Sequence, residues 1–503
     1  MTLTVYNTLT RRQEPFETIE PELVKMYCCG VTVYDYCHLG HARSYIVWDT
    51  IRRYLQWRGY HVLYIQNFTD IDDKILNRAK EQGTTMEAVA NRFIDAYFED
   101  IRRLNVMDAD EYPRVTENIP AIEELIKILE AKSYAYAVGG DVYYRVERFP
   151  VYGKLSGREL EQMRSGASGR INPEDPEEKK KEHPFDFALW KAAKPGEPAW
   201  ESPWGKGRPG WHIECSAMIQ SRLGETIDIH CGGGDLIFPH HENEIAQSEA
   251  VTNKPLARYW MHNGMVMIDG KKMSKSLGNF ITIRDLLDRN RSVDSDSTEG
   301  TSTSQLPPVD PMAVRYFVLQ AHYRKPLDFT DDAIATAEQS WKTLKEGLLF
   351  GYQYGEQLGF ATPDQKGEGL DQEIIQRFAE SGDDDFNFSM SLAVLFELAK
   401  NLQREGHILV HEGKTQTPSS QLQTQWYTLV TLAQVLGLEV NQEEIQPNDS
   451  NGLSDAEIQV LIQHRQQARS AKNFAEADRI RNELELAGIT LIDSRDSTRW
   501  HRK

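Results

Sequence analysis

Two short motifs that lie far apart along the chain contain residue types suited to chemistry on a triphosphate. The first is the HLGH tetrad of residues 38–41, and the second is the KMSKS run of residues 272–276. A helix is predicted to start at the tetrad, and helix starts offer free N–H groups and a positive dipole end to phosphate. The imidazoles of His38 and His41 can donate to phosphate oxygens as charge develops in a transition state. Taken alone, the tetrad is also compatible with two polar residues that cap a helix.

The KMSKS run adds the second side of such a site. Lys272 and Lys275 lie three residues apart among small and flexible residues, and Gly278 follows them. A loop of this kind can close over a triphosphate, and lysine provides a compact charge on a long stem for the leaving pyrophosphate. Alone, the run is also compatible with a solvated turn. Together the two motifs predict an enzyme that adenylates its substrate with ATP, which Mg²⁺ accompanies.

A second group of residues has the types that bind a metal ion. His240 and Glu244 are four residues apart on a predicted helix and therefore share one face. Cys215 precedes them, and Cys28 and Cys29 end the first predicted strand. One of these two cysteines, with the other three residues, offers the S, N and O ligands that zinc accepts. The alternative for the histidine and glutamate alone is an ordinary surface pair.

A zinc ion at this place would select a thiol. Cysteine and serine differ by one atom, and an apolar pocket discriminates poorly between such similar side chains. Zinc binds thiolate, and its coordination removes the thiol proton. The metal-binding set therefore predicts cysteine as the substrate, with no need for an editing domain.

The elements that must position these residues have the pattern of a parallel nucleotide-binding sheet. Residues 24–30 and 61–66 are predicted strands, and helical spacing covers 40–57 between them, which makes a βαβ unit. A strand over 226–230 and a helix that opens at Pro239 begin the second half. We therefore expect an α/β fold, with a Rossmann-type parallel-sheet catalytic domain that contains an inserted domain. An α-helical bundle and a small C-terminal domain are expected to follow.

Three further segments have recognisable patterns. Gly233, Gly234 and Asp235 follow a predicted strand, where a nucleotide ribose commonly lies, although a plain turn is the alternative. Helical spacing continues over 84–132. Residues 291–309 are rich in Ser, Thr, Asp and Pro and predict a disordered surface insertion.

Charge and cysteine content limit the class of protein. The net charge of −19 argues against a general binder of polyanions. The tail of residues 463–503 is different, with nine Lys or Arg against six Asp or Glu and with Trp500 among them. Basic groups with an aromatic ring suit unstacked RNA bases, and a solvated helix face is the alternative. Five cysteines and no long apolar run predict a cytoplasmic protein without membrane spans.

The two motifs resemble those of the class I aminoacyl-tRNA synthetases. HLGH is similar to the HIGH signature of that family, with Leu39 in place of isoleucine, and residues 272–276 match its KMSKS signature at every position. The resemblance implies that His38, His41 and Lys275 stabilise adenylate formation and that Lys272 supports them. It also implies two steps, in which an aminoacyl-adenylate forms and its aminoacyl group then moves to the 3′ end of a tRNA.

Other segments resemble one branch of that family, the cysteinyl-tRNA synthetases. The similar stretches are YCCGVTVYD (27–35), NFTDIDDK (67–74), RPGWHIECSAM (208–218) and FPHHENEIAQ (238–247). The resemblance implies one zinc ion per chain, held by Cys29, Cys215, His240 and Glu244. Cys29 is preferred because it directly precedes Gly30, and Cys28 stays open as the alternative. The resemblance further implies that Trp211 and Thr69 lie near the amino acid, although core packing is an equal explanation for Trp211.

The resemblance also implies the partners and the division of the chain. We expect a monomer that uses L-cysteine, ATP and tRNA(Cys) and that releases AMP and pyrophosphate. The expected divisions are 1–115 and 211–262 for the two catalytic halves, 116–210 for the inserted connective domain, 263–340 for a stem-contact domain with the KMSKS run, 341–440 for the bundle and 441–503 for an anticodon-binding region.

Three other functions stay open at this stage. The nearest is an ATP-dependent cysteine ligase that acts on an amino-sugar acceptor, as in mycothiol-type pathways. The others are a non-catalytic RNA-binding relative, which both intact motifs disfavour, and a zinc hydrolase, which leaves the lysine run unexplained.

Overall fold

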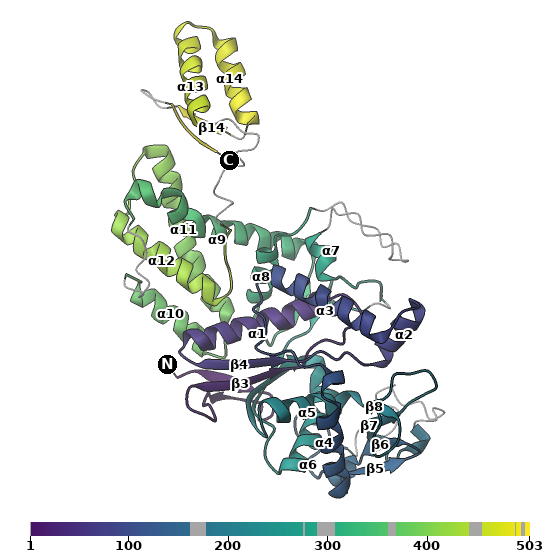
Figure 1. Cartoon of the computed structure of the whole chain (residues 1–503). Helices are drawn as coiled ribbons and strands as arrows, with labels where there is room; N and C mark the ends of the chain where they lie inside the picture. Colours follow the sequence, from purple (N-terminus) through teal and green to yellow (C-terminus); the bar gives the residue numbers. More distant parts are fainter. Residues whose placement is uncertain are drawn as a thin grey trace. The chain divides into compact units, whose positions relative to one another are not determined.

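The sheet at the centre of the fold has four parallel strands in the order β10-β9-β3-β4 (Figure 1). Its strands are β3 (Leu23–Cys28), β4 (His61–Gln66), β9 (Ile227–Gly233) and β10 (Ala257–Asn263). In register, Cys28 is opposite Gln66 on one side and Cys231 on the other. The carboxyl ends of the strands therefore meet at one edge, where ligands bind in open α/β sheets.

The computed structural model describes residues 2–160, 178–274, 277–288, 307–360, 369–441, 455–487, 489–493 and 498–502. They fall into two units. The first contains Met1–Glu338, Glu380–Ser389 and Val435–Gly437, and the second contains Gln339–Ala379, Met390–Gln434 and Leu438–Lys503. The insertion predicted at 291–309 lies outside the described residues except for its last three.

Helices lie on both sides of the parallel sheet. Helix α1 (Leu39–Trp57) connects β3 to β4 across one face, and α4 (Ile119–Ala131), α5 (Trp211–Arg222) and α6 (Glu242–Thr252) gather on the other (Figure 1). Burial on both faces explains why almost every residue of β9 is buried rather than every second one. The predicted βαβ unit and the predicted α/β fold class are thus confirmed.

The helical stretch expected over 84–132 is interrupted. Helix α3 (Met86–Arg103) ends well before α4 begins, and the intervening chain runs beside the sheet. The N–H of Asp110 donates to the oxygen of Tyr64, and the N–H of Gln66 donates to the oxygen of Glu111. Pairing with the edge strand β4 therefore takes these backbone groups away from a helix. Helix α2 (Asp73–Glu81) precedes α3.

An antiparallel sheet is inserted between the two halves of the parallel sheet. Its strands follow the order β5-β6-β7-β8 and are β5 (Ala135–Val138), β6 (Asp141–Tyr144), β7 (Phe187–Ala192) and β8 (Gly207–Pro209). Gly210 follows β8 directly and is the N-cap of α5. The inserted sheet therefore leads straight into the helix that carries Cys215.

Smaller elements complete the first unit. They are β1 (Thr4–Asn7), β2 (Arg12–Pro15), β11 (Val266–Ile268), β12 (Lys271–Lys272), β13 (Leu327–Phe329), α7 (Ile283–Leu287) and α8 (Pro311–Leu319). Strand β11 pairs with both β12 and β13, and β12 ends where the KMSKS run begins.

The helices that follow are α9 (Asp331–Leu358), α10 (Gln372–Asp383), α11 (Phe388–Glu412) and α12 (Ser419–Val435). The indole N–H of Trp426 on α12 donates to the oxygen of Leu348 on α9 at 2.7 Å. A Cβ at Gly347 would lie 2.6 Å from Ala399 on α11, so this glycine lets two helices of the bundle approach closely.

The end of the chain forms a small α/β module. It consists of α13 (Asp455–Ser470), α14 (Phe474–Leu486), β14 (Ile489–Asp493) and β15 (Thr498–Arg502). Ile458, Ile462, Ile480, Leu484 and Ile489 make its core. Within the described ranges, no helix is long and apolar enough to cross a membrane.

Candidate active site and metal centre

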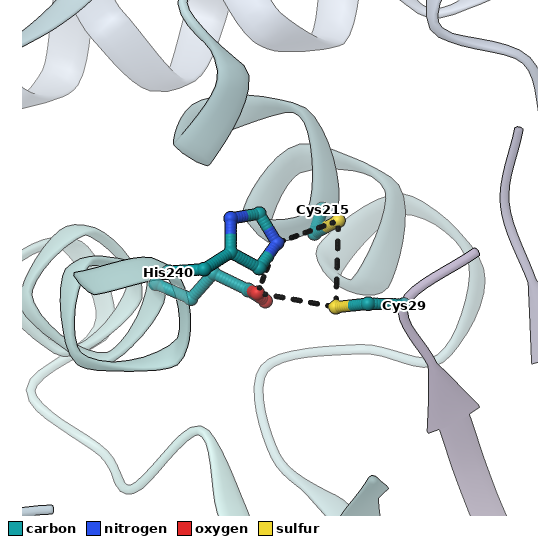
Figure 2. A group of neighbouring side chains, drawn as sticks. Cys29, Cys215 and His240 are labelled. Carbon is teal, nitrogen blue, oxygen red and sulfur yellow. Dashed lines mark hydrogen bonds and ion pairs between the residues drawn. The ribbon is translucent and has the colours of Figure 1, made fainter. Parts of the chain in front are cut away.

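Four side chains from distant parts of the sequence converge at the carboxyl edge of the parallel sheet. They are Cys29, Cys215, His240 and Glu244, and all four are almost completely buried. Figure 2 shows Cys29, Cys215 and His240 pointing toward a common point. The structure thus brings together the four residues that the sequence predicts as metal ligands.

The spacing of these donor atoms fits a tetrahedral zinc ion. Cys29 Sγ lies 3.8 Å from Cys215 Sγ and 3.4 Å from Glu244 Oε1. His240 Nε2 lies 3.6 Å from Cys215 Sγ and 3.0 Å from Glu244 Oε1. Ordinary zinc bonds at tetrahedral angles place such atoms about 3.3 to 3.8 Å apart. Three of the four distances fall in this range and the fourth is slightly shorter, so the residues fit the ion.

Local structure explains how each donor reaches this point. Cys29 follows the last residue of β3, and Cys215 lies in the second turn of α5. His240 belongs to the π-helical turn η5 (Ile237–His241), which runs directly into α6 with Glu244 in its first turn. The sequence predicts that this helix starts at Pro239. The regular α-helix begins three residues later, at Glu242. The predicted sharing of one face by His240 and Glu244 holds across this turn.

The charges within the cluster balance one another. Cys29 donates its thiol proton toward Cys215, and this contact is the main reason that the pKa of Cys215 falls to about 6 despite burial. Burial would lower the pKa of His240, but Glu244 and Cys215 raise it to about 10. Burial raises the pKa of Glu244, yet His230 and His240 together bring it well below its usual value. The cluster therefore has the composition of a cation-binding site.

Histidines that the sequence analysis did not identify surround the four donors. His212 Nδ1 lies 3.0 Å from His240 Nδ1, and His230 Nε2 lies 2.8 Å from Glu244 Oε2. These contacts orient the donors through the atoms that do not face the common point. The one indication of them in the sequence is that His230 ends the strand predicted over 226–230.

A second possible donor group shares two members with the first. It consists of Cys29, His230, His241 and Glu244. If the ion is held by the first group, His230 and His241 are neighbours of its ligands. His230 contacts Glu244 Oε2, the oxygen that faces away from the other three donors, and His241 Nε2 contacts the Cys29 sulfur at 3.3 Å. His241 also uses its Nδ1 on His262 at 2.8 Å. An ion held by Cys29, Cys215, His240 and Glu244 therefore leaves His230 and His241 as residues that orient its ligands, which explains why they also lie close to the cluster.

Two further predicted residues lie beside this cluster. The Trp211 ring stacks on the His240 imidazole with centroids 4.3 Å apart, and 41% of Trp211 is exposed. Core packing is therefore not the explanation for Trp211. Thr69 is buried, and its hydroxyl donates to Glu214 Oε2 at 2.9 Å. Glu214 directly precedes Cys215 in the sequence. Glu214 is a further residue that the sequence analysis did not identify.

The histidines of the HLGH tetrad have a defined proton arrangement. The N–H groups of Gly40 and His41 donate to His38 Nδ1 at 3.0 and 3.3 Å, and the N–H of His38 donates to His41 Nδ1 at 3.2 Å. Because each Nδ1 accepts, each ring carries its proton on Nε2. Burial and the neighbouring His38 keep the pKa of His41 well below its usual value. The tetrad therefore caps α1 and also presents two Nε2–H donors.

Gly40 lies directly beside the ring of His38. A Cβ at this position would lie 2.8 Å from His38 Cε1. The glycine therefore makes room for the His38 ring, which stacks on His41 at 3.7 Å between centroids. Among its other neighbours, Met273 of the KMSKS run comes close to the same point.

The remaining predicted residues are the two lysines of the KMSKS run and the segment of residues 233–235. Lys272 ends β12 with an exposed side chain, and its oxygen accepts from Asn279 Nδ2 at 3.1 Å. Lys275 lies outside the described residues. Gly233 caps the short turn η4 (Gly234–Leu236), in which Asp235 is exposed. This turn directly follows β9, whose last residue is Gly233.

Two known protein families match this chain. The family described as "tRNA synthetases class I (C) catalytic domain" matches residues 15–294, which is more than half of the chain. The family described as "DALR domain" matches residues 377–441, which begin within α10 and include all of α11 and α12. The matched ranges contain every residue discussed above for the site.

Similar proteins of known name extend over the whole chain. A cysteine–tRNA ligase of Nostoc sp. is 74% identical over 502 residues, and one of Rippkaea orientalis is 63% identical over 503 residues. Each match covers 100% of both chains. A solved methionyl-tRNA synthetase of Mycobacterium tuberculosis has a TM-score of 0.53 at 16% identity, covering 82% of this chain and 89% of that one. That likeness concerns the fold alone.

Proposed function

This chain belongs to the cysteine–tRNA ligases, a family of class I aminoacyl-tRNA synthetases, and on that premise we propose that it attaches L-cysteine to tRNA(Cys). Cysteine and ATP give cysteinyl-adenylate and pyrophosphate, and the cysteinyl group then moves to the tRNA with release of AMP. The observation that carries the choice of cysteine is the tetrahedral spacing of two thiols, an imidazole and a carboxylate at the carboxyl edge of the sheet.

We propose that Cys29, Cys215, His240 and Glu244 hold one zinc ion. Zinc bound there supplies a Lewis acid that favours a thiolate over a hydroxyl oxygen. Trp211, stacked on His240 and partly exposed, is proposed to cover the amino acid from the solvent side. Thr69 is proposed as a further neighbour of the substrate. This arrangement accounts for selection of cysteine over serine without a separate editing site.

The HLGH tetrad is proposed to stabilise the charge that develops on ATP. Its two Nε2–H groups are donors that need no reorganisation, because their rings are fixed through Nδ1. Lys272 and Lys275 are proposed to neutralise the leaving pyrophosphate, with Mg²⁺ bound to ATP. Gly233, Gly234 and Asp235 are proposed to line the ribose.

The C-terminal module is proposed to bind the anticodon, and the structure narrows which of its basic residues are available. Arg479 donates to both Glu476 and Glu483, and Arg465 is only 4% exposed. Lys472 and Arg481 are exposed on the same module and are the better candidates. The predicted domain boundaries, the monomeric state and the cytoplasmic location remain part of this proposal.

An amino-sugar acceptor is not favoured. The relatives that match this chain from end to end are cysteine–tRNA ligases, and the chain also matches the DALR domain family beyond its catalytic part. Transfer to tRNA is therefore the function that we propose.

The substrate is tested by ATP–pyrophosphate exchange with each of the twenty amino acids. We expect exchange with cysteine, and exchange with serine weaker by at least about a hundredfold, because a built polar or metal site rejects a near-isostere more strongly than an apolar pocket does. Equal exchange with serine, or exchange with another amino acid only, would contradict the proposal.

A further inference from the structure

The backbone around His38 is held by a segment that follows the KMSKS run. The N–H of Leu39 donates to the oxygen of Ile281 at 3.1 Å, and the N–H of Ile283 donates to the oxygen of Cys37 at 2.9 Å. These two hydrogen bonds form an antiparallel bridge, and they lie on either side of His38. Residues 281–283 therefore fix the position of the histidine backbone.

The same segment also fixes the ring of His38. The Phe280 ring meets the His38 imidazole edge-on, with centroids 5.1 Å apart and an interplanar angle of 79°. Nδ1 of His38 is already occupied by backbone N–H groups, so the position of the ring sets the direction of Nε2–H. A shift of this segment would therefore turn the donor away from where charge develops.

Helix α7, which continues from this segment, is too short to be stable by itself. It has five residues, and Thr282 caps it by accepting from the N–H of Asp285. Isolated helices of this length do not form in water, because fixing the backbone angles of the first turn loses more conformational entropy than its single hydrogen bond offsets. The position of α7, and of residues 280–283 with it, must come from contacts to other elements.

Ion pairs join α7 to α3. Arg284 Nε lies 2.8 Å from Asp100 Oδ1, and Arg284 Nη2 lies 2.5 Å from Glu99 Oε2. Asp100 is fully buried, so its carboxylate depends on the guanidinium beside it. The guanidinium also lies over the Tyr36 ring at 4.7 Å from its centroid.

A second pair ties down the far end of α7. Arg103 on α3 donates through both Nη atoms to the two carboxylate oxygens of Asp288, each at 2.9 Å. The geometry is bidentate, which fixes direction as well as distance. Helix α7 is thus held to α3 at its start and just past its end.

We propose that Arg284, held by Asp100, is a positioning residue for His38. Its guanidinium anchors α7 on α3, α7 holds residues 280–283, and that segment sets the backbone and ring of His38. The catalytic part of this inference rests on the proposed adenylation function, whereas the anchoring part does not.

Hydrogen–deuterium exchange tests the anchoring without any substrate. In Arg284→Gln, the amides of Leu39 and Ile283 are expected to exchange at least about tenfold faster, because local opening of α7 exposes both. Arg102→Gln is the matched control, since Arg102 stands on α3, the helix to which Arg284 binds, and pairs with Asp108 at 2.7 Å instead of with α7. Unchanged exchange of these two amides in Arg284→Gln would overturn the proposal.

Kinetics then test whether the anchor acts through His38. Arg284→Gln is expected to lower kcat for cysteine-dependent pyrophosphate exchange about ten- to a hundredfold, as a small misplacement of a catalytic group does. The KM for cysteine and the zinc content should not change, and Arg284→Lys should restore part of kcat. In a His38→Ala background the same substitution should have almost no further effect, because groups that act as a unit are not additive.

Two results separate the inference from the function on which it rests. Equal fold-losses from Arg284→Gln with and without His38 would overturn the positioning role while the proposed function stands. A wild-type enzyme without cysteine-dependent exchange would refute the proposed function, and the amide exchange rates would still decide whether Arg284 anchors the HLGH segment.

Discussion

Two adjacent cysteines at the end of β3 have different surroundings. Cys29 Sγ lies within 4 Å of Cys215, His241 and Glu244, whereas Cys28 Sγ turns back toward the oxygen of Cys29. Neighbouring side chains of an extended segment point to opposite sides, so only one of them can face the edge of the sheet. The geometry therefore separates two residues that are alike in type, burial and sequence position.

Replacing each cysteine by serine tests this separation. We expect purified Cys29→Ser to lose most of its bound zinc, because a hydroxyl replaces a thiolate donor. Cys28→Ser is the matched control and is expected to keep about one zinc ion per chain. Metal analysis of both proteins decides the matter, and equal zinc content in the two variants would contradict the proposed ligand set.

The residues of this site differ in how far the sequence reveals them. His240 and Glu244 are predictable, because their types and their spacing of four residues on a helix indicate a metal site, and Cys215 is predictable as a further residue of a metal-binding type. His230 and His262 are not, because their rings converge only through the register of β9 and β10 and through the π-helical turn before α6. Single histidines on apolar strands give no signal of this convergence.

At the scale of elements, α3 and α7 meet around a buried carboxyl group. Burial raises the pKa of Asp100 to about 7, and Arg284 opposes this rise. The charged and titratable groups that face Asp100 are Arg284 on α7, Glu99 and Arg103 on α3, and Cys37 before the tetrad. The folded protein thus binds a proton at Asp100 more tightly than the unfolded chain does.

This difference gives stability a pH dependence. The contribution of Asp100 is present at low pH and is lost as the pH rises toward about 7, at up to about 1.4 kcal/mol of unfolding free energy per pH unit. Asp100→Asn cannot ionise, so its stability should fall less steeply than that of the wild type between about pH 5 and pH 7. Urea denaturation across this range measures both slopes, and parallel curves would contradict the assignment.

The sequence predicts where regular helices lie better than it predicts which distant segments they pack against. The helix expected over 40–57 is observed at Leu39–Trp57, because its apolar spacing is regular and an N-capping residue precedes it. The break after α3 was missed, because it arises from pairing of a distant segment with the edge of β4. Helix α7 also had no clear signal, since five residues are too few to show a helical period, and its position depends on the ion pair of Arg284 with α3 and on burial of its apolar residues.

At the scale of the whole molecule, the predicted order of a Rossmann-type domain with an insertion, a helical bundle and a C-terminal module is confirmed. Strand and helix periodicity and the two signature motifs were sufficient for this. The C-terminal module pairs some of its own basic groups, because Glu476 and Glu483 lie three and four residues from Arg479 on α14 and both accept from it. A net basic tail therefore overstates the number of groups available to RNA.

If a zinc ion held by Cys29, Cys215, His240 and Glu244 selects cysteine, removal of the ion should abolish that selection. Pyrophosphate exchange is measured with cysteine and with serine, on the enzyme before and after removal of zinc by a chelator and after zinc is restored. We expect the preference for cysteine to be at least about a hundredfold with zinc, to collapse without it and to return on restoration. A preference for cysteine that is unchanged in fully zinc-free enzyme would contradict the account.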